Sequence, residues 1–281
     1  MRNTLSNSWA LAMASARVLN QDRALLLFPL LSGIASIGVI LTFAYPVLLF
    51  GGSEAMMAES VTGTLVFAFL YYLVQYFVVF YFNAALVGAA LVHLGGGRPT
   101  LRDGLLIAWD HAVPILGYAA LSATVGLVLN TIARKSGILG RFIGGSLGIG
   151  WTLATFLAVP VLVTRNVGPL EAVGESAALL RKSWGEQITG KVGMGLVFGV
   201  AGAGLALLSV AFVAGISALD PISLIPTYVV IALAWILFAL VASAIQGIYQ
   251  AAVYRYAVTG EGGAGFEHIA LGEVVQRERV L

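Results

Sequence analysis

Two stripes of polar side chains inside otherwise apolar sequence are the residues of this chain best suited to do chemistry. The first stripe consists of Tyr72, Gln75, Tyr76 and Asn83, and the second of Gln246, Tyr249 and Gln250. Their spacing is helical, so each stripe falls on one helix face. An amide in apolar surroundings needs a hydrogen-bond partner, because lipid offers none. The stripes therefore predict either hydrogen bonds between helices or a polar path or lipid-headgroup groove, and we expect Gln75 and Gln246 to face the protein interior.

Catalytic chemistry is poorly supported by the residue types in the apolar segments. The only bases close to these segments are His93 and His111, and both lie near predicted interfaces. The third histidine is His268, and no two histidines have metal-ligand spacing on one helix. The chain contains no cysteine. We therefore expect no enzyme, no metal and no cofactor, although three serines could in principle act as nucleophiles: Ser122, Ser209 and Ser243.

Six stretches without any Asp, Glu, Lys or Arg predict the elements that position these residues. A spanning helix needs about 20 apolar residues, and the stretches, which are all longer, are 24–53, 60–97, 111–133, 142–164, 192–219 and 221–254. The chain is 59% hydrophobic and 10% charged, with a mean hydropathy of +0.96, whereas soluble domains carry about 25% charged residues. We predict an all-α, polytopic membrane protein with six spans, at 24–49, 63–94, 112–133, 145–164, 191–217 and 225–256. The net charge of +2 is too small to indicate a nucleic-acid partner.

The distribution of Lys and Arg predicts the orientation of these spans. If the N-terminus is cytoplasmic, 12 of the 15 basic residues fall on the cytoplasmic side, and an excess of this kind marks cytoplasmic loops. We therefore expect a multi-pass protein of the cell membrane with both termini in the cytoplasm. The basic segment 134–141 is the exception. It is either an exposed turn over anionic lipid or a basic outer mouth for an anion.

Three amphipathic segments, 3–20, 100–110 and 169–184, are predicted to be helices at the cytoplasmic interface. Each carries one tryptophan, the residue type that anchors helices at membrane interfaces, and the expected anchors are Trp9, Trp109 and Trp184. The predicted apolar faces are Leu5, Trp9, Ala12, Met13 and Ala16 in the first helix, Leu101, Leu105, Ala108 and Trp109 in the second, and Leu170, Val173, Ala177, Leu180 and Trp184 in the third.

A single transmembrane domain, 1–258, and a short cytoplasmic tail, 259–281, are predicted. The tail begins with several glycines and continues into a short amphipathic stretch, which either docks or stays mobile. Within the domain, Pro46 and Pro160 fall near the ends of their predicted helices, where each is expected to kink or end the helix.

Three motifs of the chain carry a resemblance to a known family. They are 8–29, which runs from Ser8-Trp9 to Phe28-Pro29; 168–185, which runs from Gly168-Pro169-Leu170 to Ser183-Trp184-Gly185; and Ile248 to Ala257. These motifs resemble the opening, a cytoplasmic connector and the last span of a family of bacterial six-span integral membrane proteins of unknown function. The pattern is also distantly similar to the membrane domain attached to some glycerophosphodiester phosphodiesterases. The resemblance implies six spans in a bacterial inner membrane, with no known activity and no catalytic residue.

Three functional hypotheses follow from the sequence. The first is a non-enzymatic membrane module that binds lipids or a partner, which would be another membrane protein or a second copy of the chain; it is motivated by the patterning of the interfacial helices. The second is a transporter or channel for a lipid, an anion or a small solute, which requires a polar cavity between the second and sixth spans. The third, an intramembrane hydrolase, has the least support because the spans lack a base.

Overall fold

Every regular element in the described part of the chain is a helix. The computed structural model describes residues 2–49, 61–135, 137–184, 189–217 and 224–266. The elements are α1 (Arg2–Gln21), the 3-10 helix η1 (Arg23–Leu26), α2 (Leu27–Leu49), α4 (Val61–Leu94), α5 (Leu101–Asp110), α6 (Ala112–Lys135), α7 (Gly137–Ala154), α8 (Ala158–Thr164), α9 (Pro169–Trp184), α10 (Thr189–Ser217) and α11 (Leu224–Thr259). The all-α fold class is therefore confirmed.

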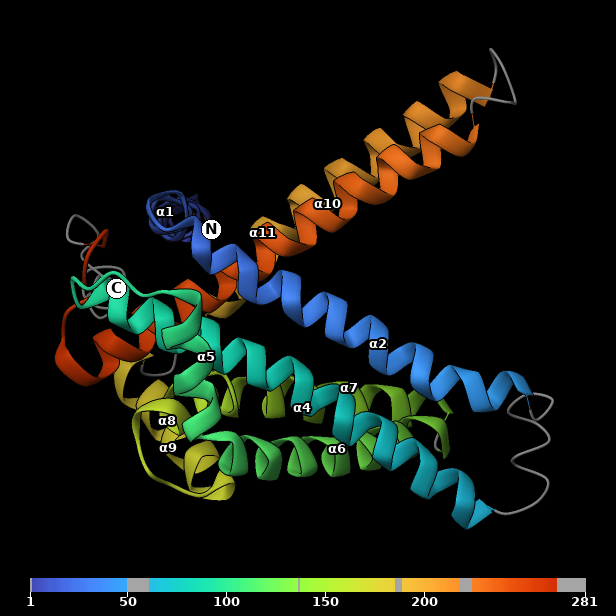
Figure 1. The fold of residues 1–281 in the computed structure, drawn as a ribbon, viewed down its shortest axis with the longest axis horizontal. Coiled ribbons are helices and arrows are strands. Elements are labelled where there is room, and N and C mark those ends of the chain that lie inside the picture. Colours follow the sequence, from blue (N-terminus) through green and yellow to red (C-terminus); the bar gives the residue numbers. More distant parts are fainter. Residues whose placement is uncertain (1, 50–60, 136, 185–188, 218–223, 267–281) are drawn as a thin grey trace.

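Six segments of these helices are long and apolar enough to cross a membrane, as predicted. They are Arg23–Leu49, Thr62–Leu94, Ala112–Ile132, Gly145–Thr164, Val197–Gly215 and Ile225–Thr259. The chain is a multi-pass membrane protein. In Figure 1, α2, α4, α6 and α7 run together toward one end of the molecule, whereas α10 and α11 form a hairpin that diverges from α2. The central helix is α4, which packs against α2, α5, α6, α8 and α11.

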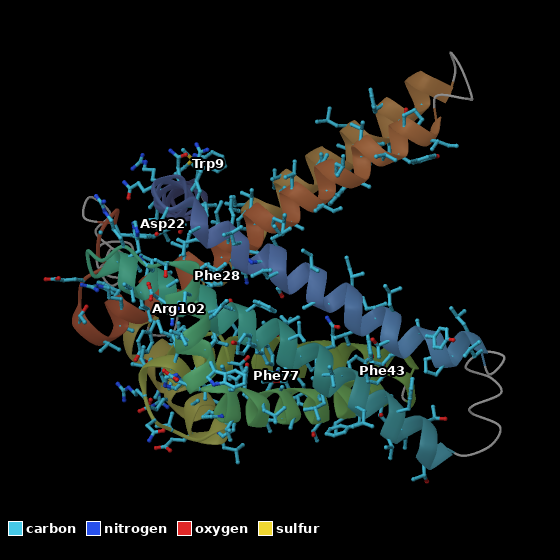
Figure 2. All side chains as sticks on the ribbon, in the orientation of Figure 1. Trp9, Asp22, Phe28, Phe43, Phe77 and Arg102 are labelled. Carbon is cyan, nitrogen blue, oxygen red and sulfur yellow. The ribbon has the colours of Figure 1, made fainter. Side chains whose placement is uncertain are left out.

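The three short helices α1, α5 and α9 lie at one end of this bundle (Figure 1). Figure 2 places Trp9 and Arg102 at this end and Phe43 toward the other. The α5 helix begins with a capping box: the Thr100 N–H donates to Asp103 Oδ2 at 2.8 Å, and the Asp103 N–H donates to Thr100 Oγ1 at 3.2 Å. These paired bonds satisfy backbone donors that the first helical turn cannot satisfy itself. The capping box therefore fixes where α5 starts.

The predicted apolar faces of the short helices are only partly right. In α1 the buried side chains include Leu11, Ala12 and Val18, because this face packs on α10 and α11. Trp9 and Met13 lie on the exposed side. The α5 and α9 faces likewise pack in large part against the bundle, since Leu101, Leu105, Ala108, Val173 and Leu180 all contact or belong to the hydrophobic core. The short helices therefore cover the protein core and present single apolar side chains outward.

The fourth span, predicted as one helix with a kink or end at Pro160, consists of two helices. α7 ends at Ala154, α8 begins at Ala158, and 155–157 form a turn between them. Pro160 explains the break. It has no N–H to offer the carbonyl of Phe156, four residues earlier, and its ring crowds that carbonyl in a continuous helix. The effect of Pro160 thus falls on the turn before it.

The glycine-rich segment after α11 packs back onto the bundle. Gly260, Gly263 and Gly265 adopt positive φ angles of 82°, 86° and 85°, which side chains with a Cβ rarely allow. The N–H of Ala264 donates to the carbonyl of Leu94 at 3.1 Å, and Phe266 is only 1% exposed. The tail is therefore docked as far as Phe266, and 267–281 lie outside the described residues.

Candidate functional site

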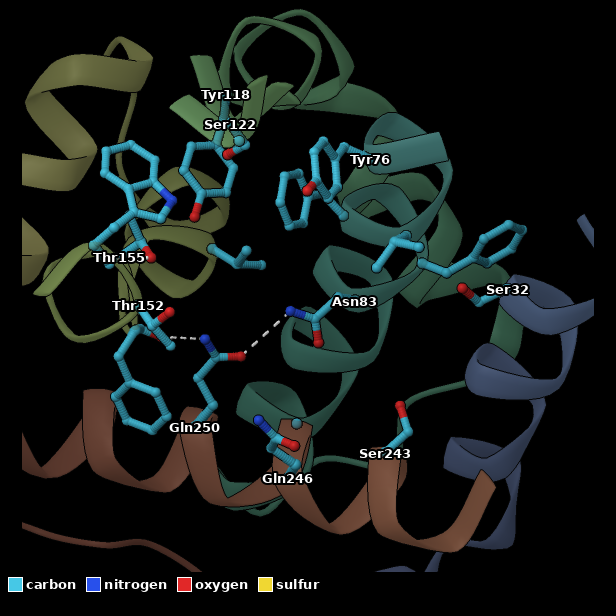
Figure 3. Close-up of a pocket in the computed structure, with 18 of the residues that line it drawn as sticks. Ser32, Tyr76, Asn83, Tyr118, Ser122, Thr152, Thr155, Ser243, Gln246 and Gln250 are labelled. Carbon is cyan, nitrogen blue, oxygen red and sulfur yellow. Dashed lines mark hydrogen bonds between the residues drawn. The ribbon is translucent and has the colours of Figure 1, made fainter. Parts of the chain in front are cut away.

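A pocket of about 480 Å³ lies between the spans, bounded by α2, α4, α6, α7 and α11 and by the turn that breaks the fourth span. Figure 3 shows hydroxyl and amide side chains from these helices converging on it. Four of the predicted stripe residues line the pocket: Tyr76, Asn83, Gln246 and Gln250. The two stripes, which are far apart in sequence, are thus brought together around one space.

The other three stripe residues lie outside the pocket lining. Tyr72 stacks on Tyr76, with ring centroids 6.0 Å apart. Tyr249 is 1% exposed and packs against Phe156. The Oε1 atom of Gln75 is buried, in line with its predicted inward orientation. Gln246, by contrast, is an exposed residue whose side chain borders the pocket. Unlike Gln75, it is therefore not packed in the protein interior.

Gln250 and Asn83 form a hydrogen-bonded connection across three elements. The Nδ2 of Asn83 donates to Oε1 of Gln250 at 3.4 Å, and the Nε2 of Gln250 donates to the carbonyl of Phe156 (Figure 3). Pro160, four residues later, has no N–H to offer that carbonyl. These two amides therefore form hydrogen bonds between elements. Gln250, on α11, donates to a backbone carbonyl in the turn that interrupts the fourth span.

A second side chain, on α9, bonds the backbone of the same turn. The Oγ of Ser176, on α9, accepts a hydrogen bond of 2.8 Å from the N–H of Leu157. Ser176 is fully buried. A buried backbone N–H without a partner costs free energy comparable to a lost hydrogen bond, so Ser176 and Gln250 together make the turn stable.

One wall of the pocket is aromatic. Tyr76 stacks on Phe80 with ring centroids 5.7 Å apart, and Phe80 packs against Tyr118 at 4.6 Å. Ser122 and Thr155 line the pocket beside Tyr118 (Figure 3). This wall joins α4, α6 and the broken span, and it offers flat apolar surface with hydroxyl groups at its edge.

The opposite side of the pocket is more open. Ser32, on α2, and Ser243 and Gln246, on α11, border it there (Figure 3). In the described part of the chain, none of these three side chains makes a hydrogen bond to the protein. Their hydrogen-bonding capacity is therefore free for a ligand.

Comparison with known protein families supports the resemblance seen in the motifs. Residues 61–266 match the model of a family described as "Family of unknown function (DUF6159)". The chain belongs to this family. No curated protein and no solved structure matches the chain. The similarity of this DUF6159 chain to the membrane domain of glycerophosphodiester phosphodiesterases is not shown by these comparisons.

The two histidines of the DUF6159 chain that the structure describes, His93 and His111, lie away from the pocket lining. His93 Nδ1 is 3.6 Å from Oδ2 of Asp22, and His111 Nδ1 is 2.8 Å from the carbonyl of Ile107. Neither lines the pocket, although two of the serines considered as nucleophiles, Ser122 and Ser243, do. Among the described residues, no cluster of side chains could hold a metal ion.

Two of the three expected anchors have described side chains. Trp9 is 59% exposed and Trp109 is 69% exposed. Trp184 is the last residue of α9, and its side chain lies outside the described part, as do those of the basic segment 134–141. Other pocket residues of the DUF6159 chain were missed from sequence. They are hydroxyl residues within the spans, namely Ser32, Tyr118, Thr152 and Thr155, and nothing in their spacing marked them.

Proposed function

We propose that the protein is a non-enzymatic membrane module that binds a lipid in the pocket between α4 and α11. The observation that carries this proposal is a space of about 480 Å³ among the spans with an aromatic wall on one side and unused amide and hydroxyl groups on the other. Ligand pockets are typically apolar with a few polar groups that orient the ligand. The molecules that surround this pocket in a bilayer, and that combine apolar and polar parts, are lipids.

The proposed setting is the cell membrane, with both termini in the cytoplasm. The excess of Lys and Arg on one side of the predicted topology supports this orientation. The exposed Trp9 and Trp109, at the end of the bundle where α1 and α5 lie, suit a headgroup interface. In this proposal lipids are the partners, nucleic acids are not, and another membrane protein or a second copy of the chain is the alternative partner.

Lipid retention by purified protein tests the proposal. The full chain and the Gln246→Leu variant would be purified in mild detergent and examined by native mass spectrometry and lipid extraction. Gln246 borders the pocket without a protein hydrogen bond, so its replacement weakens ligand binding without breaking the fold. The matched control is Gln75→Leu, the same change in a span but outside the pocket lining.

We expect one lipid class to be retained by the wild type and by Gln75→Leu, and to be lost in part from Gln246→Leu. Equal lipid profiles in all three proteins would refute pocket binding. Co-purification of a stoichiometric membrane protein in place of lipid would instead support the alternative partner.

Lipid transport is the second candidate, because the pocket is lined by a broken span. Transporter sites are commonly built where spanning helices are interrupted, since the freed backbone groups face a cavity there. Here the turn 155–157 contributes Thr155 and Phe156 to the lining. Movement of fluorescent lipids between the leaflets of proteoliposomes would support transport. Retention of lipid without such movement would exclude transport and support lipid binding alone.

A further inference from the structure

The charge of the pocket restricts what it can hold. Among the described residues that line it, none is Asp, Glu, Lys, Arg or His. An ionised group inside a membrane domain without a partner costs several kcal/mol, and in practice it is excluded. A phosphate or ammonium group in this pocket would have no counter-charge. The ligand group that enters must therefore be uncharged.

The free polar groups indicate which uncharged chemistry fits. An amide both donates and accepts hydrogen bonds, and so does a hydroxyl. Gln246 supplies an amide, and Ser243 and Ser32 supply hydroxyls, on the open side of the pocket. A ligand hydroxyl matches this set, because it too donates and accepts. A purely apolar ligand would leave these groups unpaired.

The size and opening of the pocket indicate where the rest of the ligand lies. A volume of about 480 Å³ falls in the range of roughly 300–1,000 Å³ that holds a drug-sized molecule. It does not hold two acyl chains, each spanning about 15 Å of one leaflet. The chains must leave the pocket, and α2 and the α10–α11 hairpin diverge on the side where Ser32 and Ser243 lie (Figures 1 and 3).

Resting on the proposed function, we infer that the pocket takes the uncharged, hydroxyl-bearing head of a membrane lipid, with its acyl chains emerging between α2 and α11. Gln246 and Ser243 hydrogen-bond the hydroxyl head, and the Tyr76–Phe80–Tyr118 wall faces the carbon atoms of the head from the opposite side of the pocket. Diacylglycerol is the simplest lipid of this chemical class. Phosphatidic acid has the same chains and differs only in carrying a phosphate.

Photolabelling with this matched pair tests the inference. The full chain would be reconstituted in phosphatidylethanolamine–phosphatidylglycerol vesicles that contain either photoactivatable diacylglycerol or photoactivatable phosphatidic acid with identical chains. We expect diacylglycerol to label peptides of α4 and α11 at least about tenfold more than phosphatidic acid, because the charge is excluded from the pocket. Gln246→Leu should lower the labelling by roughly two- to tenfold, the equivalent of one hydrogen bond.

The exit of the acyl chains between α2 and α11 is tested with introduced cysteines, since the native chain has none. Ser32→Cys or Ser243→Cys, modified with a bulky lipid-soluble maleimide, should abolish diacylglycerol labelling. Leu237→Cys is the control, because Leu237 is exposed on α11 but does not line the pocket. Unchanged labelling after modification at either serine position would overturn the route.

The outcomes separate this inference from the proposed function. If phosphatidic acid labels the pocket as strongly as diacylglycerol, the pocket binds lipid but the uncharged head is wrong. If labelling is insensitive to Gln246→Leu, the assigned head contact is wrong. If neither probe labels any pocket peptide, lipid binding in the pocket fails altogether, and with it both proposals.

Discussion

Replacing Gln250 by Leu should destabilise the protein through the backbone of a different helix. Gln250 is 8% exposed and donates its amide to the carbonyl of Phe156. Leu is close to Gln in volume, so the change removes the donor and creates little empty space. Removing a hydrogen-bond partner from a buried polar group costs about 1–3 kcal/mol, and Pro160 has no N–H to offer the Phe156 carbonyl in place of the Gln250 amide. We expect a loss of about 2 kcal/mol in the free energy of unfolding.

The cause can be isolated with a double-mutant cycle. Pro160→Ala restores an N–H four residues after Phe156, so the carbonyl regains a donor within its own helix. In that background Gln250→Leu should cost about 1–2 kcal/mol less than in the wild type, which is a coupling energy of the size seen for directly interacting residues. Unfolding by sodium dodecyl sulfate, followed by circular dichroism, gives the free energy of unfolding of the detergent-solubilised wild type, the two single variants and the double variant.

The control is Gln246→Leu, the same substitution one turn earlier on α11, where the side chain makes no protein hydrogen bond. Its effect should lie within about 0.5 kcal/mol. The reasoning is refuted if Gln250→Leu is as stable as the wild type, or if its cost is the same with Pro160 and with Ala at that position.

Two further predictions concern α5. A Cβ at Gly104 would overlap the ring of Phe28 and lie 2.8 Å from the carbonyl oxygen of Ala85, so Gly104→Ala should cost about 1–3 kcal/mol of stability. The control is Gly174→Ala on α9, where nothing lies within 4 Å, and which should be neutral or stabilising by up to about 1 kcal/mol. Thermal unfolding of both variants measures the difference, and equal melting temperatures would contradict the packing at Gly104. The hydrogen bond from the Thr100 N–H lowers the pKa of Asp103 below its ordinary value, so the cap stabilises the fold above the unfolded-state pKa of about 3.9 and is lost as the pH falls through the lower folded-state value. Asp103→Asn should therefore flatten the acid limb of a stability–pH curve, and an unchanged limb would show that another group produces it.

The sequence was sufficient for the elements that depend on local signals. Charge-free length located the six spans, and the amphipathic pattern of 169–184 located α9, which has the same bounds. A kink or helix end was predicted at Pro160, but not the turn at 155–157 before it, because that turn depends on Gln250, a residue 90 positions away from Pro160 that donates to the Phe156 carbonyl. Without that partner a break at membrane depth would be unfavourable.

The pocket hydroxyls were missed for a related reason. Ser and Thr within helices commonly bond the carbonyl four residues back, as Thr124 does to Ala120 and Thr131 to Leu127. A hydroxyl that satisfies its own helix and one that lines a pocket therefore look alike in sequence. The faces of the short helices could not be assigned either, because an amphipathic helix suits a lipid interface and a protein core equally well, and only the packing of α1 on α10 and α11 decides between them.

The partnership between the fourth and last spans has a consequence for how the chain is assembled. Gln250 belongs to the C-terminal half of α11, where the buried residues of that helix, Thr227 apart, run from Ala244 to Tyr254. Among the described spans, α11 is the last in chain order and therefore the last to leave the ribosome. Until it inserts, Gln250 cannot bond the Phe156 carbonyl or Asn83, and the pocket lacks the residues that α11 contributes to its lining. The pocket and the hydrogen bonds that Gln250 makes to α4 and to the turn in the fourth span are therefore completed only when α11 has joined the earlier spans.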